Sequence, residues 1–222
     1  MSKINDNFKQ KVASIPTIKR LPSYLNLVKR ASQEGVEIIS ATNIAKELDL
    51  EPIQVRKDLA VTGIIGKPRI GYNVNELFQA IQSFLNWDKK HKAIIVGTGN
   101  LGSALMKYGE LKNHGLTIVG IADASPEKIG TEKNNLTISD VNDLPALIKK
   151  TGATMIILTV PPSEAQNVAE VINDTDIKAI WNFTNVKLKV SDRILVLMED
   201  LSSGYAVLSF HLPFYKENED TE

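Results

Sequence analysis

Residues 92–105 read Lys-Ala-Ile-Ile-Val-Gly-Thr-Gly-Asn-Leu-Gly-Ser-Ala-Leu, and this stretch decides the fold. Residues 93–96 are apolar, which predicts a buried strand, and a helical pattern follows the glycines. Gly97, Gly99 and Gly102 have the spacing G-x-G-x-x-G. In this context the three glycines allow a sharp turn, close approach of the backbone to a pyrophosphate, and close packing of helix on strand. The free N–H groups at the start of the helix would then face the phosphates.

An acidic residue follows at the distance that a dinucleotide site requires. Asp123 ends a second predicted strand, residues 116–122. A carboxylate there accepts hydrogen bonds from ribose hydroxyls and repels a 2′-phosphate. The next residue is Ala124, so no adjacent cation would attract NADP. The stretch predicts a dinucleotide site that prefers NAD(H); the alternative is a domain of the same fold with an empty or repurposed pocket.

Composition limits the classes of protein to consider. A chain of 222 residues accommodates two domains, and it has no apolar run of about 18 residues that would span a membrane. The N-terminus lacks the apolar segment of a signal peptide. The absence of cysteine excludes disulfides, thiol catalysis and cysteine-based zinc sites. We expect a cytoplasmic protein with no membrane segment and no metal site.

Charge is distributed unevenly along a chain whose net charge is zero. Residues 1–74 hold 12 Lys and Arg against 7 Asp and Glu, a net of +5, so the remainder carries −5. Such asymmetry indicates a basic module joined to an acidic one. Chance and solvated faces are the alternative explanation.

The acidic part alternates strands and helices. Strands are predicted at 93–96, 116–122, 153–160, 178–183 and 193–198, and helices at 100–113, 140–150 and 164–172, with a turn and short helix at 125–130. Ser163 is expected to cap the helix at 164–172. This order predicts an open parallel sheet with a crevice at the carboxyl ends of its strands. The predicted cofactor-binding residues are Gly97, Thr98, Gly99, Asn100, Leu101, Gly102 and Asp123, with Thr159, Val160 and Pro161 at a later strand end; simple loop geometry is the alternative for these last three.

The basic part predicts a helix-turn-helix. Residues 1–16 are expected to form a flexible arm, and a helix is predicted at 17–33, starting near Leu21 because Pro22 suits only a first turn. A second helix is predicted at 41–48, a turn at Asp49, whose type tolerates left-handed dihedrals, and a third helix with Pro52 in its first turn.

The third helix has the side chains of a DNA-recognition helix. Ile53, Leu59 and Val55 are expected to pack inward. Gln54, Arg56 and Lys57 are expected to face outward, where glutamine reads adenine, arginine reads guanine or phosphate, and lysine binds phosphate.

A hairpin predicted at 62–74 would form a wing, with Lys67 and Arg69 at its tip. Arg69 could enter a minor groove. The alternative is a winged helix that serves protein contacts.

The remaining segments complete a domain plan. A helix predicted at 76–87 connects the two halves, and the apolar helix at 201–214 would be buried against a partner subunit, or alternatively against its own domain. The predicted fold class is α/β: an N-terminal winged helix-turn-helix domain plus a C-terminal Rossmann-like parallel-sheet domain with a terminal helix that we expect to be domain-swapped. The predicted boundaries are 1–16 for the arm, 17–88 for the DNA-binding domain, 89–200 for the NAD(H)-binding domain, 201–215 for the dimerisation helix and 216–222 for a disordered tail.

No residue pattern supports catalysis. A nicotinamide dehydrogenase needs a proton donor or acceptor near the hydride centre. His91 and His114 are expected at the far end of the sheet, and His211 lies in the terminal helix. We predict that the chain is not an enzyme and that the cofactor is sensed. A small NAD-dependent oxidoreductase with a fused helical domain is the main alternative, followed by a CoA- or nucleotide-binding interaction module.

The chain resembles the Rex family of redox-sensing transcriptional repressors from about Ile15 to Leu212. The motifs that carry the resemblance are Arg20-Leu-Pro-Ser-Tyr24, Gln54-Val-Arg-Lys-Asp-Leu59, Gly66-Lys-Pro-Arg-Ile-Gly-Tyr-Asn-Val74, the glycine stretch 97–105, Asp123 with Pro126-Glu-Lys-Ile-Gly130, Leu158-Thr-Val-Pro161, Asn182-Phe183 and Glu199-Asp-Leu-Ser202. The resemblance implies a homodimer with swapped C-terminal helices that binds an inverted-repeat operator when NADH is low and releases it when NADH replaces NAD.

The resemblance also implies roles for single residues. Matched positions make Arg56, Lys57, Lys67 and Arg69 DNA-contacting residues, and Arg20, Tyr108 and the partner's Asp200 a network that links the nicotinamide state to domain orientation. Two departures from the family pattern stand out. This chain has Val61-Thr62 where an aromatic pair is common, and Thr184-Asn185 where Ala-Pro is usual.

Overall fold

The computed structural model describes residues 13–214. The predicted N-terminal arm as far as residue 12 and the predicted tail at 216–222 lie outside this range. The described chain divides into two compact units between Lys90 and His91. We call them the helical unit and the sheet unit, and each is described by itself.

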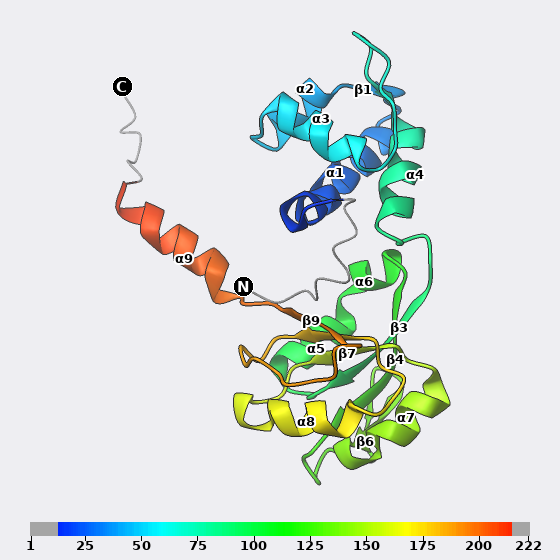
Figure 1. Ribbon diagram of the computed structural model, residues 1–222, viewed down its shortest axis with the longest axis vertical. Coiled ribbons are helices and arrows are strands. Elements are labelled where there is room, and N and C mark those ends of the chain that lie inside the picture. Colours follow the sequence, from blue (N-terminus) through cyan, green and yellow to red (C-terminus); the bar gives the residue numbers. More distant parts are fainter. Residues whose placement is uncertain (1–12, 215–222) are drawn as a thin grey trace. The chain divides into compact units, whose positions relative to one another are not determined.

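The helical unit contains four helices and a two-stranded sheet (Figure 1). Helix α1 has a buried face of leucine, tyrosine and valine side chains that packs with α2, α3 and α4 around one core. Strands β1 and β2 pair antiparallel, with Ile39 opposite Tyr72. The elements are α1 (Ile15–Gln33), β1 (Ile38–Ile39), α2 (Ala41–Glu47), α3 (Pro52–Ala60), β2 (Tyr72–Asn73) and α4 (Val74–Phe84).

Helix α1 begins earlier than the sequence predicted. The expected start near Leu21 is wrong, because the helix begins at Ile15 and Ser14 caps it by accepting a hydrogen bond from the Thr17 N–H. Pro22 therefore lies inside the helix, where a missing N–H and a ring clash are unfavourable. Burial of the adjacent Leu21 and Tyr24, both 0% exposed, offsets that local cost.

The sheet unit is a seven-stranded sheet in the order β5-β6-β4-β3-β7-β8-β9. All neighbouring strands are parallel except β5, which pairs antiparallel with β6. Without β5, the strand order β6-β4-β3-β7-β8-β9 is that of a doubly wound dinucleotide-binding sheet. The elements are β3 (His91–Val96), α5 (Asn100–Lys107), α6 (Gly109–Asn113), β4 (Leu116–Asp123), β5 (Glu132–Lys133), β6 (Leu136–Asp140), η2 (Val141–Asp143), α7 (Leu144–Thr151), β7 (Met155–Leu158), η3 (Pro162–Glu164), α8 (Ala165–Ile172), β8 (Ala179–Asn182) and β9 (Leu195–Met198).

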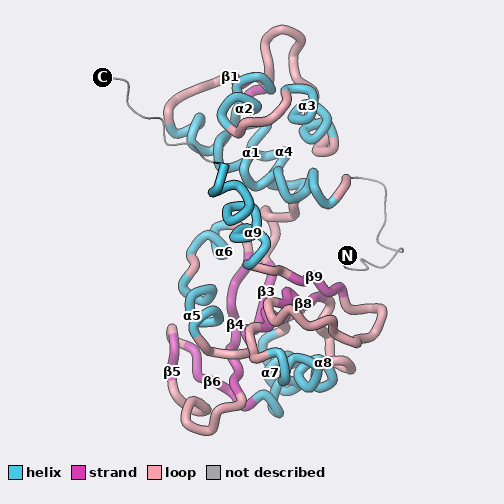
Figure 2. Tube along the Cα trace, turned by 90° about the vertical axis from the view of Figure 1, so that its left-hand side faces the viewer, coloured by secondary structure: helices cyan, strands magenta, loops and turns pink. Residues whose placement is uncertain are grey.

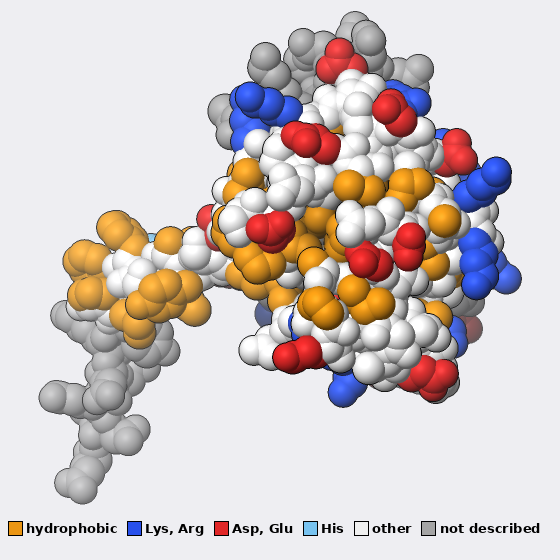
Figure 3. All heavy atoms as spheres, turned by 90° about the horizontal axis from the view of Figure 1, so that it is seen from below, with side chains coloured by type: hydrophobic (Ala, Val, Ile, Leu, Met, Phe, Trp, Pro, Cys, Tyr) orange, Lys and Arg blue, Asp and Glu red, His pale blue; other side chains and the backbone are white. Residues whose placement is uncertain are grey.

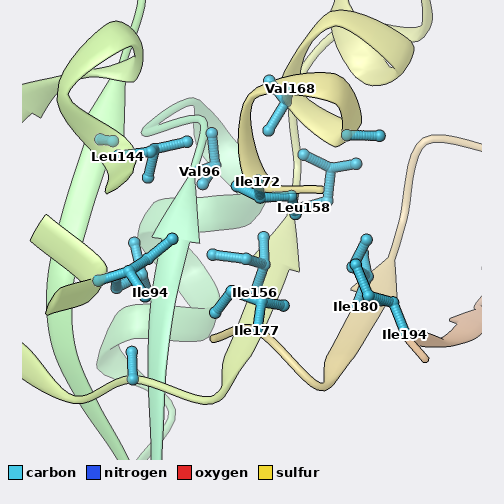
Figure 4. Close-up of a cluster of buried hydrophobic side chains, with 14 of the residues drawn as sticks. Ile94, Val96, Leu144, Ile156, Leu158, Val168, Ile172, Ile177, Ile180 and Ile194 are labelled. Carbon is cyan, nitrogen blue, oxygen red and sulfur yellow. The ribbon is translucent and has the colours of Figure 1, made fainter. Parts of the chain in front are cut away.

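Side chains alternate between the two faces of the sheet, as the pleat of a strand requires. Ile94 and Val96 pack with Ile156 and Leu158 beneath helices α7 and α8 (Figure 4). Residues Ala93 and Ile95 point to the other face, which α5 covers through Met106 and Leu105. Figure 2 shows the strands of this unit between α5 and the pair α7 and α8.

Several details of the sheet unit differ from the sequence predictions. The hairpin β5–β6 was not predicted, and 125–130 forms a turn without a helix. The helix predicted at 100–113 breaks at Tyr108, whose ψ of 95° is extended, so it becomes α5 and α6. Ser163 does not cap α8, because it lies inside η3 and Glu164 occupies the cap position.

The chain ends its described part with α9 (Ser202–His211) and η4 (Leu212–Phe214). Every residue from Ser202 to Phe214 is exposed, including Tyr205, Leu208 and Phe210 at 65–70%. Hydrophobic side chains cover the face of α9 that Figure 3 shows. This helix is hydrophobic yet buries nothing within the single chain.

Candidate functional site

The glycine turn has the geometry that the sequence predicted. Gly97 has a φ of +96°, and a Cβ on Gly102 would lie 2.0 Å from the Gly97 carbonyl oxygen, so neither position accommodates a larger residue. Thr159 at the end of β7 fixes the turn by donating its hydroxyl to the same oxygen at 2.7 Å. A Cβ on Gly99 would meet nothing within 4 Å, so the space beside it is open.

The start of α5 is free to bind an anion. Gly99 occupies its N-cap position, and no side chain caps the helix. Uncapped N–H groups and the helix dipole attract negative charge at such an end. Lys133 adds a cation nearby, because its Nζ donates to the Ser103 hydroxyl at 2.6 Å and to the Thr98 carbonyl at 3.2 Å.

Asp123 is held in place by four hydrogen bonds. Its Oδ2 accepts from the N–H and hydroxyl of Thr98 and from Lys128 Nζ, and its Oδ1 accepts from the Ser125 N–H. Burial alone would raise the pKa of Asp123, but these donors outweigh it and hold the pKa well below its usual range. Asp123 is therefore a fixed anion, and its Oδ1, which accepts one hydrogen bond against three at Oδ2, retains capacity to accept another from a ribose hydroxyl.

The turn and Asp123 border one cleft of about 730 Å³. Its walls include six of the ten predicted cofactor residues: Gly97, Gly99, Asp123, Thr159, Val160 and Pro161. The other four support the turn: Thr98 bonds to Asp123, Gly102 packs beneath Gly97, and Asn100 and Leu101 begin α5. An apolar wall of Val141, Val168 and Val171 completes the cleft.

Sequence reasoning missed two lysines at this site. Lys128 lies five residues after Asp123 and forms an ion pair with it at 3.0 Å, so a cation does adjoin the ribose carboxylate although Ala124 follows in sequence. Lys133 lies on the unpredicted hairpin. The segment Pro126–Gly130 carried a signal for Lys128, whereas only the fold brings Lys133 to the turn.

In the helical unit, α2 and α3 form a helix-turn-helix, and α3 is its second helix. Asp49 has a φ of 52°, as expected for the turn, and Pro52 lies in the first turn of α3. Val55 and Leu59 are fully buried, but the expected burial of Ile53 is wrong, since Ile53 is 61% exposed. At 100° per residue, Ile53 falls on the face of Arg56 and Lys57, both of which are exposed as predicted.

A buried carboxylate fastens α3 to α1. Asp58 is 1% exposed and accepts hydrogen bonds from Thr17, Tyr24, Gln54 and, through two nitrogens, Arg20. Burial would raise the pKa of Asp58, but these donors lower it to about 2. Burial, and to a smaller extent the hydrogen bond to Asp58, raises the pKa of Tyr24 to about 12.

The Asp58 cluster occupies two predicted site residues. The Gln54 amide, expected to face outward, is half-buried and donates to Asp58 at 2.9 Å. The Arg20 guanidinium, predicted to take part in redox coupling, pairs with Asp58 at 2.7 Å.

The wing has a tight basic tip. Lys67 and Gly71 form a β-bridge, and Arg69 between them has a φ of 62°. Lys67, Arg69 and Ile70 are exposed. The tip extends from the helical unit between α3 and β2 (Figure 1). This arrangement places two predicted DNA-contacting cations on one loop.

The remaining predicted residues belong to different units. Tyr108 lies between α5 and α6 and is 56% exposed, and Asp200 follows β9. Arg20 belongs to the helical unit, so the proposed network of these three stays a prediction. His91 begins β3 and His114 ends α6, at the amino end of the parallel strands and away from the cleft, as predicted.

The described residues hold neither a metal-binding cluster nor a helix that could span a membrane. Among residues 13–214, no group of three or more His, Asp or Glu residues could hold a metal ion. Within the same part of the chain, no helix has the length and apolar character needed to cross a membrane.

Two family models match the chain. A model described as "Putative DNA-binding protein N-terminus" matches residues 13–60, which cover α1 to α3. A model described as "CoA binding domain" matches residues 88–186, which cover the sheet unit from β3 past β8.

Relatives and solved structures agree on one family. The redox-sensing transcriptional repressor Rex of Treponema denticola is 51% identical over 90% of this chain and 95% of its own. The redox-sensing transcriptional repressor Rex 1 of Thermotoga maritima is 40% identical over 89% of this chain and 94% of its own. The crystal structure of RSP, a Rex-family repressor, with NAD+ and operator DNA has a TM-score of 0.85 at 31% identity, covering 92% of this chain and 94% of that one. The crystal structure of RSP with NADH has a TM-score of 0.83 at 30% sequence identity, covering 92% of this chain and 96% of that one.

These relatives are named as transcriptional repressors, which is a regulatory and not a catalytic role. One chain holds both parts: the glycine turn and the fixed carboxylate in its sheet unit, and the helix-turn-helix with its wing in its helical unit. The chain belongs to the Rex family of redox-sensing transcriptional repressors.

Proposed function

We propose that this chain represses transcription as a homodimer in the cytoplasm, binding an inverted-repeat operator and releasing it when NADH replaces NAD. The observation that carries the proposal is the union, in one chain, of a dinucleotide cleft at Asp123 with a cationic helix face at Arg56 and Lys57. RSP has been crystallised with NADH and, separately, with NAD+ and operator DNA.

The cleft suits NAD(H) better than other nucleotides. The open space at Gly99 and the uncapped start of α5 fit a pyrophosphate, and the ionised Asp123 fits a ribose with a free 2′-hydroxyl. Coenzyme A belongs to the family description of residues 88–186, but a 3′-phosphate on its ribose would meet the same anion. We therefore assign NAD and NADH as the ligands.

An incompletely covered sheet face supports the homodimer. Ile95, Ile157, Trp181 and Leu197 lie side by side on the α5 face across β3, β7, β8 and β9. The first two are fully buried, Trp181 is half-buried, and Leu197 at the edge is 36% exposed. The apolar helix α9 is exposed as well. A second copy that contributes its α9 would cover both surfaces, as a swapped dimer does.

Coupling between the two halves follows from a shift in population. Winged helices in a dimer reach two half-sites only when about one DNA turn, or a multiple of it, separates them. NAD and NADH differ in ring charge and puckering, so a ligand that favours one domain angle must bind that state better. Asp200 is an exposed carboxylate whose pKa is lowered by hydrogen bonds from Ser202. We propose that it distinguishes the two rings and that Tyr108 and Arg20 transmit the difference.

The test is fluorescence anisotropy with an inverted-repeat duplex in the presence of NAD or NADH. NADH should release the duplex and NAD should not. Arg56→Ala should abolish DNA binding and leave NADH binding intact. A chain that binds no inverted repeat, or that NADH leaves bound, would refute the proposal.

A matched variant isolates the cofactor step. Gly99→Ala adds a methyl group into open space, so the fold is unaffected, while the backbone can no longer approach a pyrophosphate closely. We expect Gly99→Ala to bind the duplex normally and to resist release by NADH. Asp200→Ala should bind both nucleotides and respond to them alike. An unchanged NADH response in Asp200→Ala would remove that residue from the mechanism.

A further inference from the structure

Helix α3 divides into a buried and an exposed face. Val55, Asp58 and Leu59 are buried, whereas Ile53, Arg56 and Lys57 are exposed. Ile53 precedes the two cations by three and four residues, which places all three on one surface of the helix. In α3, every residue of which the structure describes, Ile53 is the one large aliphatic side chain that is exposed.

The position of Ile53 matters because it is the second residue of α3. Recognition helices contact base edges with their amino-terminal residues and the DNA backbone with flanking cations. Gln54, the polar residue in this turn, is half-buried and donates its amide nitrogen to Asp58 at 2.9 Å. Of the four residues of the first turn, Pro52–Val55, Ile53 is the one that is exposed, so its aliphatic side chain is the one best placed to meet a base edge.

The major groove offers one apolar group to such a side chain, the 5-methyl group of thymine. An isoleucine that is 61% exposed in the free protein gains from covering that methyl group, and Arg56 and Lys57 beside it suit the phosphates. We propose that Ile53 contacts the 5-methyl group of a thymine in each half-site of the operator. This inference rests on the proposed function, because it assigns a base to the DNA-binding face.

The test removes the methyl group without changing hydrogen bonding. A duplex selected by this protein from a randomised inverted-repeat library is resynthesised with deoxyuridine in place of each thymidine in turn, symmetrically in both half-sites. At one position the wild-type affinity should fall about fourfold per half-site, or about 15-fold for both, as expected for one buried methyl group. Ile53→Ala should bind the unmodified duplex with a similar loss and should be indifferent to deoxyuridine at that position.

Ile70→Ala is the matched control, because Ile70 is 57% exposed against 61% for Ile53 but lies on the wing. Its loss on deoxyuridine substitution at the same position should equal that of the wild type. A deoxyuridine penalty that persists in Ile53→Ala, or that no thymine produces, would overturn the inference while operator binding itself stands. Failure of the wild type to bind any selected duplex would instead refute the proposed function, and this assignment with it.

Discussion

The substitution Asp58→Ala should destabilise the helical unit more than any change on its surface. Asp58 connects α3 to α1 through hydrogen bonds that span 34 to 41 residues of sequence. Without the carboxylate, the hydroxyl of Tyr24, which is 0% exposed, loses its acceptor inside the core. The hydroxyl of Thr17, 7% exposed, keeps the Ser14 hydroxyl as a partner at 3.0 Å. The Arg20 side chain, 29% exposed, regains part of its hydration.

The magnitude follows from these partners. Each buried hydroxyl left without an acceptor costs about 1–3 kcal/mol, and the loss of one partner from a buried ion pair costs about 3–5 kcal/mol. Because Arg20 reaches solvent, we expect a decrease of about 3–5 kcal/mol in the free energy of unfolding for the whole cluster. The charge itself accounts for about 2 kcal/mol, since the pKa of Asp58 falls from 3.8 to about 2. As the folded pKa is lowered, that part is present above pH ~4 and lost as the pH falls towards 2.

The assay uses the two tryptophans of the chain, one in each unit. Trp87 precedes the boundary at Lys90, and Trp181 lies in β8. In a Trp181→Phe background, urea unfolding followed by fluorescence reports the helical unit alone. A loss of about 4 kcal/mol should move the midpoint down by about 2 M urea.

Glu47→Ala is the control, because Glu47 pairs with Arg30 at 2.9 Å while both side chains are more than half exposed. Such a surface pair contributes no more than about 1 kcal/mol. If Asp58→Ala lowers the midpoint no further than Glu47→Ala does, the Asp58 cluster does not hold α3 on α1, and the reasoning fails.

Three further predictions concern the sheet unit. Gly102→Ala, unlike Gly99→Ala, should lower the unfolding temperature reported by Trp181 as well as NADH affinity, because the new Cβ would lie 2.0 Å from a carbonyl oxygen; normal stability would contradict the close packing. Lys128→Met should increase the ratio of NADH to NADPH affinity in calorimetric titrations, because Asp123 loses its cation at 3.0 Å; an unchanged ratio would show that Lys128 has no part in specificity. Phe210→Glu on α9 should produce monomers in sedimentation equilibrium, and a persistent dimer would place the interface elsewhere.

The parts of the fold that the sequence predicted well are those decided by neighbouring residues. The strand before Gly97, the turn and the helix after it follow from local pattern, and so does Pro52 in the first turn of α3. The parallel sheet and the cleft at the carboxyl ends of its strands follow from the alternation of strands and helices. The full strand order does not, because β6, which lies beside β4, was not among the predicted strands.

The Asp58 cluster could not be predicted because its members are distant in sequence. A hydrophobic pattern places Ile53 inside and Asp58 outside, yet the helix does the reverse. Asp58 is buried only because Thr17, Arg20 and Tyr24 on α1 supply its hydrogen bonds. Nothing within α3 itself discloses those partners, apart from Gln54 four residues earlier.

The two departures from the family pattern also have local explanations that only coordinates supply. Thr62 donates its hydroxyl to the Leu59 carbonyl at 2.7 Å and so closes the end of α3. Thr184 donates to Asn182 at 2.7 Å, and Asn185 has a φ of 57°, a conformation that proline cannot adopt. The loop after β8 therefore has a backbone that the usual Ala-Pro pair would not allow.

The exposed helix α9 has a consequence for gene regulation. If its apolar side chains are buried only in a dimer, as we propose, the folded repressor exists in proportion to the square of the free chain concentration. Occupancy of the operator then rises with the square of the free chain concentration, independently of the nicotinamide signal. Synthesis of the chain sets the level of repression in this way, while the cleft continues to read the ratio of NADH to NAD.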